Sequence, residues 1–412
     1  MADALTELLE LPQEEKVRLG AVHTSAEIAQ QPFIWRDTAE RFAGKRDEIL
    51  DFLKKSKALT ARGRIVMTGA GTSDYIGRCV EPALRTVLKA EARAVPSTEI
   101  VTLPEVAFIP KNHYLLVNFA RSGNSPESVG SFRFANETAS NVHHLAITCN
   151  REGKLAQFAR ENPEKAYSLL LHDRANDESL VMTSSFSGMV VAGLALAHVK
   201  RFRGFPKLAE KMAKAGERML AKGADLAKTV AAMDFKRTVY LGTGALLGAA
   251  TESALKGQES TSGDVISKVE SFVGLRHGPQ AVIHDDTLVV AYVSSDPYVR
   301  RYELDLLKEN RAKGLGMMTV AVATESDDEL DACVDEVIEI QPRGKKKLPD
   351  IARAPVDNIF GQMLGVFKSM ELGYSPDAPS KTGVIHRVVE GISVYDRGKF
   401  SREGVFEVFA GR

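Results

Sequence analysis

The strongest constraint on the fold is an internal similarity, because three apolar segments of this chain recur at one fixed spacing. The paired segments begin at Arg64 and Arg237, at Leu115 and Leu288, and at Leu145 and Met318. The offset is the same for each pair, since 237−64, 288−115 and 318−145 are equal. One offset shared by three pairs predicts a duplicated domain.

These segments have the character of buried strands. Each is four to seven residues long, rich in Val, Ile and Leu, and without polar alternation, which is typical of parallel strands covered on both faces. Helices are expected between them, at residues 74–90, 126–140 and 297–313. The pattern predicts an α/β protein with two similar domains, each a parallel sheet with helices on both faces and right-handed crossovers.

Two further helical segments complete the expected organisation. Residues 206–233 contain few helix breakers and predict a long amphipathic helix that joins the halves. Residues 24–57 predict a helical arm that packs against one half. The predicted division is an N-terminal arm at 1–58, a first domain at 59–205, a second domain with its leading linker helix at 206–385, and a C-terminal tail at 386–412.

Composition excludes several classes of protein. The 412 residues carry 54 Lys and Arg against 54 Asp and Glu, and a net charge of zero argues against nucleic acid or an anionic membrane as partner. The start of the chain does not resemble a signal peptide, and no apolar stretch reaches the roughly 20 residues of a membrane helix. Three scattered cysteines suit a reducing compartment. We therefore expect a soluble cytoplasmic protein.

Two loops after strands of the first half could hold a phosphate. The segment 68–74 contains glycines followed by Thr72 and Ser73, and the segment 120–128 contains Ser122 and Ser125 before a proline. Backbone amides at a helix start favour an anion, and hydroxyls there can donate to it. The bland alternative is that these residues only cap helices. Neither the GxGxxG fingerprint nor a GxxxxGK[ST] loop is present, so a dinucleotide or NTP site is not supported.

A possible acid–base group lies in the second half. Glu252, Lys256 and Glu259 have the spacing of one helix face, although a surface ladder of salt bridges has the same spacing and is common. His277 lies in a tight Gly-Pro turn, where it could exchange a proton near neutral pH. Lys381 lies in a loop of small residues near the C-terminus. The other eight histidines show no spacing typical of metal ligands, and we expect no metal or cofactor.

Together these motifs resemble the sugar isomerase (SIS) superfamily, in particular the isomerase half of glucosamine-6-phosphate synthase. The chain is more similar still to the galactosamine-6-phosphate deaminase/isomerase (AgaS-type) family, whose members are also called tagatose-6-phosphate ketose/aldose isomerases. The resemblance extends from residue 26 to residue 390. Its motifs are GAGTS, FARSGNSPES, ANDESLVMTSSF, ESALKGQE and GLRHGP.

The resemblance implies tandem SIS domains, a sugar phosphate substrate, and a role for each matching residue. Glu259 resembles the base that moves a proton between C1 and C2 of the opened sugar, and Lys256 would orient it. His277 resembles the residue that opens the ring, commonly from a neighbouring subunit, which implies a homodimer or larger assembly. Lys381 resembles a loop lysine that can form an imine with a ketose. The implied substrate contacts are Thr72, Ser73, Arg121, Ser122 and Ser125 at the phosphate and Glu178 and Val181 at the sugar.

The sequence departs from the synthase pattern at two places. Ala120 and Arg121 replace a Ser-Gln pair, and Thr183, Ser184 and Ser185 replace a Ser-Thr-Lys, so phosphate and sugar contacts there are expected to differ.

The resemblance and the short N-terminal arm together predict the direction of the reaction. Only the segment 1–63 precedes the first predicted strand, and it contains no cysteine, so we expect no glutaminase domain and favour release of ammonia over its use. The predicted reaction converts galactosamine 6-phosphate to tagatose 6-phosphate and ammonia. Two alternatives stay open: a phosphosugar aldose–ketose isomerase without deamination, and a non-catalytic SIS protein that binds a sugar phosphate.

Overall fold

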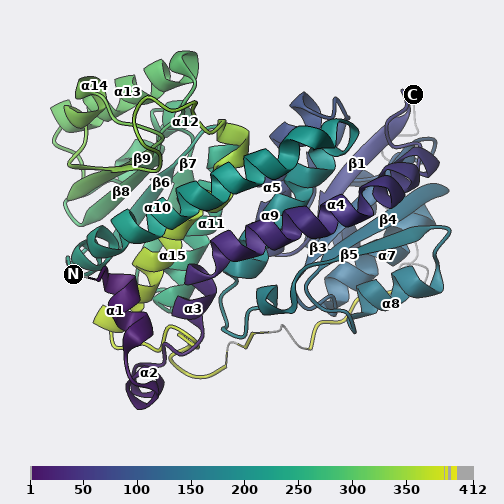
Figure 1. Cartoon of the computed structure of the whole chain (residues 1–412), viewed down its shortest axis with the longest axis horizontal. Coiled ribbons are helices and arrows are strands. Elements are labelled where there is room, and N and C mark those ends of the chain that lie inside the picture. Colours follow the sequence, from purple (N-terminus) through teal and green to yellow (C-terminus); the bar gives the residue numbers. More distant parts are fainter. Residues whose placement is uncertain (1, 385, 388–390, 397–412) are drawn as a thin grey trace, which may run out of the picture.

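The computed structural model contains two parallel five-stranded sheets, joined by helices that lie between them (Figure 1). It describes residues 2–384, 386, 387 and 391–396. Most of the tail predicted at 386–412 therefore lies outside the described residues. Within the described part, no helix combines the length and the apolar character needed to cross a membrane.

The first sheet, which we call the front sheet, has the strand order β2-β1-β3-β4-β5. Its strands are β1 Gly63–Thr68, β2 Ala92–Ala94, β3 His113–Ala120, β4 Asn141–Thr148 and β5 Ala166–Leu170. The helices of this half are α5 Thr72–Thr86, α6 Ser97–Thr102, η1 Pro104–Val106, α7 Pro126–Thr138, α8 Lys154–Glu161, η2 Asp173–Ala175, α9 Ser184–Ala197 and η3 Val199–Gly204. We call this part the front half.

The rear sheet has the order β10-β9-β8-β6-β7, which is the same 2-1-3-4-5 order when its strands are counted from β6. Its strands are β6 Arg237–Leu241, β7 Ile266–Glu270, β8 Thr287–Tyr292, β9 Met318–Ala323 and β10 Glu336–Glu339. The helices of this rear half are α11 Ala245–Ser260, α12 Phe272–Leu275, η4 Pro279–Val282, α13 Pro297–Ala312, α14 Asp328–Asp331, η5 Asp350–Ala352 and α15 Ala354–Glu371. The three segment pairs related by one offset are the first, third and fourth strands of each sheet, so the predicted α/β fold with two parallel sheets is confirmed.

One hydrophobic core runs between the two sheets. Alternate residues of both sheets, such as Met67 in β1 and Tyr240 in β6, face this shared core, while the residues between them, such as Val66 and Val239, face a separate core on the outer side of each sheet. Side chains alternate between the two faces of a strand, so each sheet is covered by helices on both faces. This explains why the strands are apolar runs without polar alternation.

The N-terminal helices contact both halves, which differs from the expectation that they pack against one. They are α1 Ala4–Glu10, α2 Gln13–Leu19, α3 Thr24–Ala29 and α4 Gln31–Lys55. Helix α4 packs against α9 of the front half and lies beside the linker helix α10 Phe205–Ala231, whereas α3 packs against α15 of the rear half (Figure 1). The apolar stripe of α4 includes Trp35 and Phe42, both fully buried.

Candidate active site

The strand order of the front sheet reverses at β1, because β2 lies on one side of β1 and the later strands, beginning with β3, lie on the other. The loops that leave β1 and β3 at their carboxyl ends therefore diverge, and the helices α5 and α7 begin beside the space between them. Such a switch point is where open α/β sheets bind ligands. The loops predicted to hold a phosphate are the two loops at this point.

The first loop depends on two glycines. Gly71, just before α5, has a φ of +56°, which a side chain rarely tolerates. A Cβ at Gly69 would lie 2.5 Å from the backbone carbon of Ser73, so the backbone approaches there too closely for any other residue. The turn places Thr72 and Ser73 in the first turn of α5, and within the described residues the hydroxyl of Ser73 has no hydrogen-bond partner.

The second loop is built around serine hydroxyls. Ser125 caps α7 by accepting from the backbone N–H of Ser128 and donates to the Ser128 hydroxyl at 2.7 Å. The Ser122 oxygen accepts from the backbone N–H of Asn124 at 3.3 Å. The structure thus brings Ser122 and Ser125 to the amino end of α7, where backbone amides and the helix dipole favour an anion.

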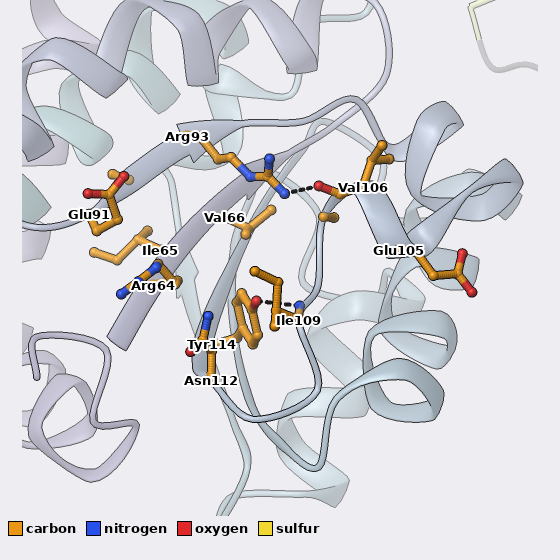
Figure 2. A pocket seen from close by; sticks show the side chains of 12 residues that line it. Arg64, Ile65, Val66, Glu91, Arg93, Glu105, Val106, Ile109, Asn112 and Tyr114 are labelled. Carbon is orange, nitrogen blue, oxygen red and sulfur yellow. Dashed lines mark hydrogen bonds between the residues drawn. The ribbon is translucent and has the colours of Figure 1, made fainter. Parts of the chain in front are cut away.

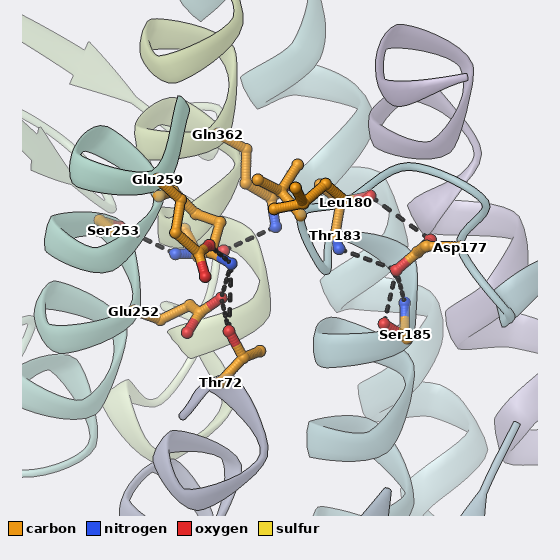
Figure 3. A network of polar contacts seen from close by, with 12 residues as sticks. Thr72, Asp177, Leu180, Thr183, Ser185, Glu252, Ser253, Glu259 and Gln362 are labelled. Atoms are coloured by element: carbon orange, nitrogen blue, oxygen red, sulfur yellow. Dashed lines mark hydrogen bonds and ion pairs between the residues drawn. The ribbon is translucent and has the colours of Figure 1, made fainter. Parts of the chain in front are cut away.

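The predicted acid–base residues of α11 meet the first loop directly (Figure 3). The ammonium of Lys256 donates to Glu259 Oε2 at 2.5 Å and to Thr72 Oγ1 at 3.0 Å, and it lies 3.2 Å from Glu252 Oε1. Thr72 in turn donates to Glu252 Oε1 at 3.1 Å. Helices α5 and α11 pack antiparallel, because Thr72 at the start of α5 contacts the later part of α11. Helix α11 of the rear half therefore reaches across to the carboxyl edge of the front sheet. The surface-ladder alternative fails, because the side chains of Glu252 and Lys256 are 0% and 2% exposed.

Burial sets the charges in this network. It raises the pKa of Glu252 to about 8, although Lys256 opposes the shift. Glu252 Oε2 has no hydrogen-bond partner among the described residues, which suits an oxygen that carries a proton. Burial alone would lower the pKa of Lys256, but the neighbouring carboxylates of Glu252 and Glu259 outweigh it and raise that pKa. The ammonium is therefore fixed as a cation beside Glu259.

Glu259 also opens onto a cavity of about 300 Å³. Its side chain is 31% exposed, unlike its two buried neighbours. The cavity is lined by Leu180, Leu255, Gln258, Glu259, Ser262, Gly263, Pro379 and Ser380. A carboxylate that is half open to a cavity and held by a buried cation is suited to exchange protons with a bound molecule.

Two predicted catalytic residues lie apart from this network. The Lys381 ammonium pairs with Asp264 at 2.6 Å and lies over the ring of Tyr374, next to the cavity wall formed by Pro379 and Ser380. Exposed His277 follows α12, beyond the carboxyl end of β7, at the edge of the rear sheet where α11 begins. Glu259 lies near the other end of α11, and the stretch of helix from 245 to 259 is about 21 Å long.

The segment expected to line the sugar pocket contributes a different residue to the cavity. Leu180 lines it, whereas Val181 is buried at 2% exposure and Glu178 extends toward solvent, 3.7 Å from His23. Thr183, Ser184 and Ser185 form the start of α9, and Asp177 caps it, because its carboxylate accepts from the backbone N–H of all three. Figure 3 shows Leu180 on the side of Glu259 and Asp177 on the far side of Leu180.

The equivalent loops of the rear half hold carboxylates of the protein itself. Gly242 and Gly244 repeat the positions of Gly69 and Gly71, with a φ of +60° at Gly244. Glu303 accepts from the hydroxyl of Thr243 and from the backbone N–H of Ser294, both at 2.7 Å.

Asp350 binds the next residue of the rear loop, Ser295, in a similar way. Its carboxylate accepts from the backbone N–H of Ser295 at 2.9 Å and from the Ser295 hydroxyl at 2.7 Å. The Ser294 hydroxyl also donates to Asp350. These donors of the rear loops are therefore used internally.

A second cavity lies away from both sets of loops. It has about 270 Å³ and is lined by residues near the amino ends of β1 and β3, including Arg64, Tyr114 and Asn112, and by Arg93 of the edge strand (Figure 2). Because this is the opposite edge of the front sheet, the cavity does not join the site at Glu259. No group of three or more potential metal ligands occurs among the residues described.

Comparison with known proteins identifies close relatives, although no family model matches the chain. The AgaS protein of Streptomyces coelicolor is 40% identical over 382 residues, which cover 91% of this chain and 96% of that protein. A D-galactosamine-6-phosphate deaminase AgaS of Escherichia coli is 36% identical over 378 residues, with 90% and 95% covered.

Solved structures agree with these relatives. The tagatose-6-phosphate ketose/aldose isomerase from Escherichia coli superposes with a TM-score of 0.81 at 34% identity, covering 90% of this chain and 96% of that one. The C-terminal domain of a glucosamine-fructose-6-phosphate aminotransferase from Francisella tularensis shares the fold, with a TM-score of 0.68 at 18% identity over 85% and 96% of the two chains.

Proposed function

This chain belongs to the family of the D-galactosamine-6-phosphate deaminases AgaS, and on that premise we propose that it converts galactosamine 6-phosphate to tagatose 6-phosphate with release of ammonia. The observation that carries the proposal is the junction of Thr72, Lys256 and Glu259. It ties a carboxylate of the rear half to the loop of the front half that is suited to a phosphate.

The phosphate group would be held at the amino ends of α5 and α7. Ser73, Ser122 and Ser125 supply hydroxyl donors there, and the backbone amides of both helix starts supply more. The cavity beside Glu259 would take the carbon chain of the opened sugar. Thr72 is already engaged with Glu252 and Lys256, so we assign it to orienting the network rather than to the phosphate.

Glu259 would act as the base. It takes the proton from C2 of the opened amino sugar and returns it to C1, which moves the double bond and leaves an imine at C2. Water then adds to C2 and the C–N bond breaks, so one substrate and one water give one ketose phosphate and one ammonia. The Lys256 cation stabilises the negative charge that develops on the oxygen at C1.

His277 and Lys381 would act from outside the Glu259 network. We propose that His277 serves the ring-opening step in the site of a neighbouring subunit, because within one chain it lies at the edge of the rear sheet where α11 begins, whereas Glu259 lies near the other end of that helix. This role requires a homodimer or larger assembly. Lys381, now paired with Asp264, would reach the cavity only if its loop moves, and imine formation there belongs to the same proposal. We assign the protein to the cytoplasm, where sugar phosphates are metabolised.

A coupled ammonia assay on the purified protein tests the function. Galactosamine 6-phosphate, glucosamine 6-phosphate and their N-acetyl forms are supplied in parallel, together with tagatose 6-phosphate as a hexose phosphate without nitrogen. We expect ammonia and a ketose 6-phosphate in equal amounts from galactosamine 6-phosphate. Interconversion of hexose phosphates without ammonia from any hexosamine phosphate would establish the plain isomerase instead. Binding without turnover of any of these compounds would establish the non-catalytic alternative.

A further inference from the structure

Residues 176–181 belong to the loop between η2 and α9. Charged side chains from three other parts of the chain hold them in place. These side chains bind mainly the backbone of the loop. Leu180 of this loop lines the cavity beside Glu259. The position of the loop therefore decides the shape of one cavity wall.

Arg121 provides the contact from the phosphate loop. Its Nη1 donates to the carbonyls of Ser179 and Leu180 at 3.0 and 3.2 Å, and its Nη2 donates to the carbonyl of Arg387 at 2.7 Å. The residue is 7% exposed. Both terminal nitrogens are thus turned toward carbonyls of the cavity wall and the C-terminal segment, although the backbone of Arg121 lies directly before Ser122.

Glu27 holds the same loop from the N-terminal arm. Its Oε1 accepts from the backbone N–H of Glu178 at 2.5 Å and of Ser179 at 3.2 Å, and its Oε2 accepts from the hydroxyl of Ser179. Glu27 is 6% exposed. Both oxygens of this carboxylate are used by the loop, so Glu27 holds it from α3 of the N-terminal arm.

The C-terminal segment completes the arrangement. Arg387 donates from Nε to the carbonyl of Asp177 at 2.7 Å, and the backbone N–H of Leu180 donates to the carbonyl of Asp377 at 2.9 Å. The carbonyl and the N–H of Leu180 are therefore held by two different parts of the chain, the phosphate loop and the C-terminal segment.

We propose that Arg121 is a positioning residue, which ties the phosphate loop to the cavity wall at Leu180 and does not itself bind the phosphate. Occupation of the loop by an anion would fix the backbone of Arg121, and its guanidinium would then fix the wall that faces the sugar carbons. This inference rests on the proposed function for the identity of the substrate. The link between the loop and the wall stands on geometry alone.

The test compares Arg121→Gln with Arg121→Lys and Glu27→Gln. Arg133→Gln is the matched control, because Arg133 also donates to a backbone carbonyl of the C-terminal segment, that of Tyr395, from a more exposed place on α7. Three quantities are measured: the affinity for inorganic phosphate by calorimetry, kcat and KM for ammonia release, and hydrogen–deuterium exchange of residues 176–185.

We expect Arg121→Gln to leave the affinity for inorganic phosphate unchanged, to speed exchange of residues 176–185, and to lower kcat by about 10-fold to 100-fold, as misplacement of a substrate-facing wall would. Glu27→Gln should reproduce this pattern, Arg121→Lys should recover part of kcat, and Arg133→Gln should resemble the wild type. A loss of about tenfold or more in phosphate affinity for Arg121→Gln, with unchanged exchange, would make Arg121 a phosphate ligand and overturn the proposal. If the wild type releases no ammonia, the proposed function fails, but phosphate affinity and exchange still decide the role of Arg121.

Discussion

The two halves share a sheet order and a pair of loop glycines, yet they use the switch point of the sheet in opposite ways. In the front half the loop hydroxyls of Ser73 and Ser122 lie at helix starts, and no carboxylate of the described residues accepts a hydrogen bond from them. In the rear half Glu303 and Asp350 accept hydrogen bonds from the corresponding loops. Carboxyl side chains of the protein thus lie in the rear half where the front half is suited to a bound anion. The same framework can therefore serve binding in one half and stability in the other.

The packing of α5 against α11 shows the same contrast. The offset between the halves relates Cys79 to Glu252, Ala83 to Lys256 and Thr86 to Glu259, since 252−79, 256−83 and 259−86 equal the offset between the paired strands. It also relates Thr72 and Ser73 to Ala245 and Leu246. The start of α11 therefore lacks the hydroxyls found at the start of α5, and α5 lacks the carboxylates and the ammonium that α11 presents to the front loops. Only one of the two possible sites is chemically equipped.

The largest expected effect is that of replacing the proposed base, Glu259. Glu259→Gln is expected to lower kcat for ammonia release by about 10²- to 10⁴-fold, because the amide cannot take the proton. Thr86→Val, at the equivalent position of α5, should leave kcat unchanged. Both variants are assayed for ammonia and for binding of galactosamine 6-phosphate. Normal turnover in Glu259→Gln would remove Glu259 as the base.

The next largest effect concerns stability of the rear half. Arg353 is fully buried and its Nη2 donates to Asp357 at 2.7 Å, with Asp350 at 3.3 Å from Nη1. Arg353→Met leaves buried carboxylates without a cation, so the free energy of unfolding is expected to fall by about 3–5 kcal/mol. Urea unfolding measures it, and Arg343→Met, which removes a mostly exposed arginine paired with Glu339, should change it by less than about 1 kcal/mol. Similar losses in the two variants would contradict a structural role for the rear loops.

A smaller effect is the pH dependence that Glu303 contributes. Burial raises the pKa of Glu303 to about 7, against hydrogen bonds from Ser294 and Thr243 that lower it. The folded state therefore holds a proton that the unfolded chain releases near the ordinary carboxyl pKa of 4.5. This stabilisation is complete below the unfolded pKa and is lost as the pH rises through about 7.

Glu303→Gln removes this dependence. When the pH rises from below 4.5 to above about 7, the unfolding free energy of the wild type is expected to fall by about 2–3 kcal/mol relative to that of the variant. Urea unfolding at several pH values measures the difference. A difference that does not vary with pH would show that Glu303 titrates normally.

The smallest effect compares two loop serines. Ser122→Ala should raise KM for the sugar phosphate by about tenfold, the value of one hydrogen bond to a charged group. Ser294→Ala in the rear loop should leave KM unchanged, because the Ser294 hydroxyl donates to Asp350. Equal changes in KM would place a bound anion at both switch points.

Much of the fold could be predicted because buried parallel strands leave a strong trace in sequence. The first, third and fourth strands of each sheet are apolar runs, and all six are predicted from the sequence. The edge strands leave little trace: β2 has three residues, and β7 is exposed or half-buried along its length with Ile266 at 65% exposure. The two-sided packing of the arm also has no local signal, since it depends on where the two halves come to lie.

The site is harder to predict from the sequence, because it too depends on contacts between distant parts of the chain. Glu252, Lys256 and Glu259 are recognisable as one helix face, but their burial comes from α5, which lies about 180 residues earlier in the chain. The sequence therefore places Glu252 on this helix face but does not predict its burial. The family resemblance implies a contact of Arg121 with phosphate, whereas the direction of its guanidinium depends on Ser179 and Leu180. Asp177 could be recognised as a helix cap, yet Glu27 has no signal in the sequence.

The antiparallel contact between α5 and α11 bears on how this polypeptide could be divided. A break within α10 would yield one fragment with the anion loops and no base, and another with the base and no anion loops. Neither fragment could be active by itself, and a mixture could work only after reassociation. The linker helix is thus a covalent tether that keeps two incomplete partners at high effective concentration.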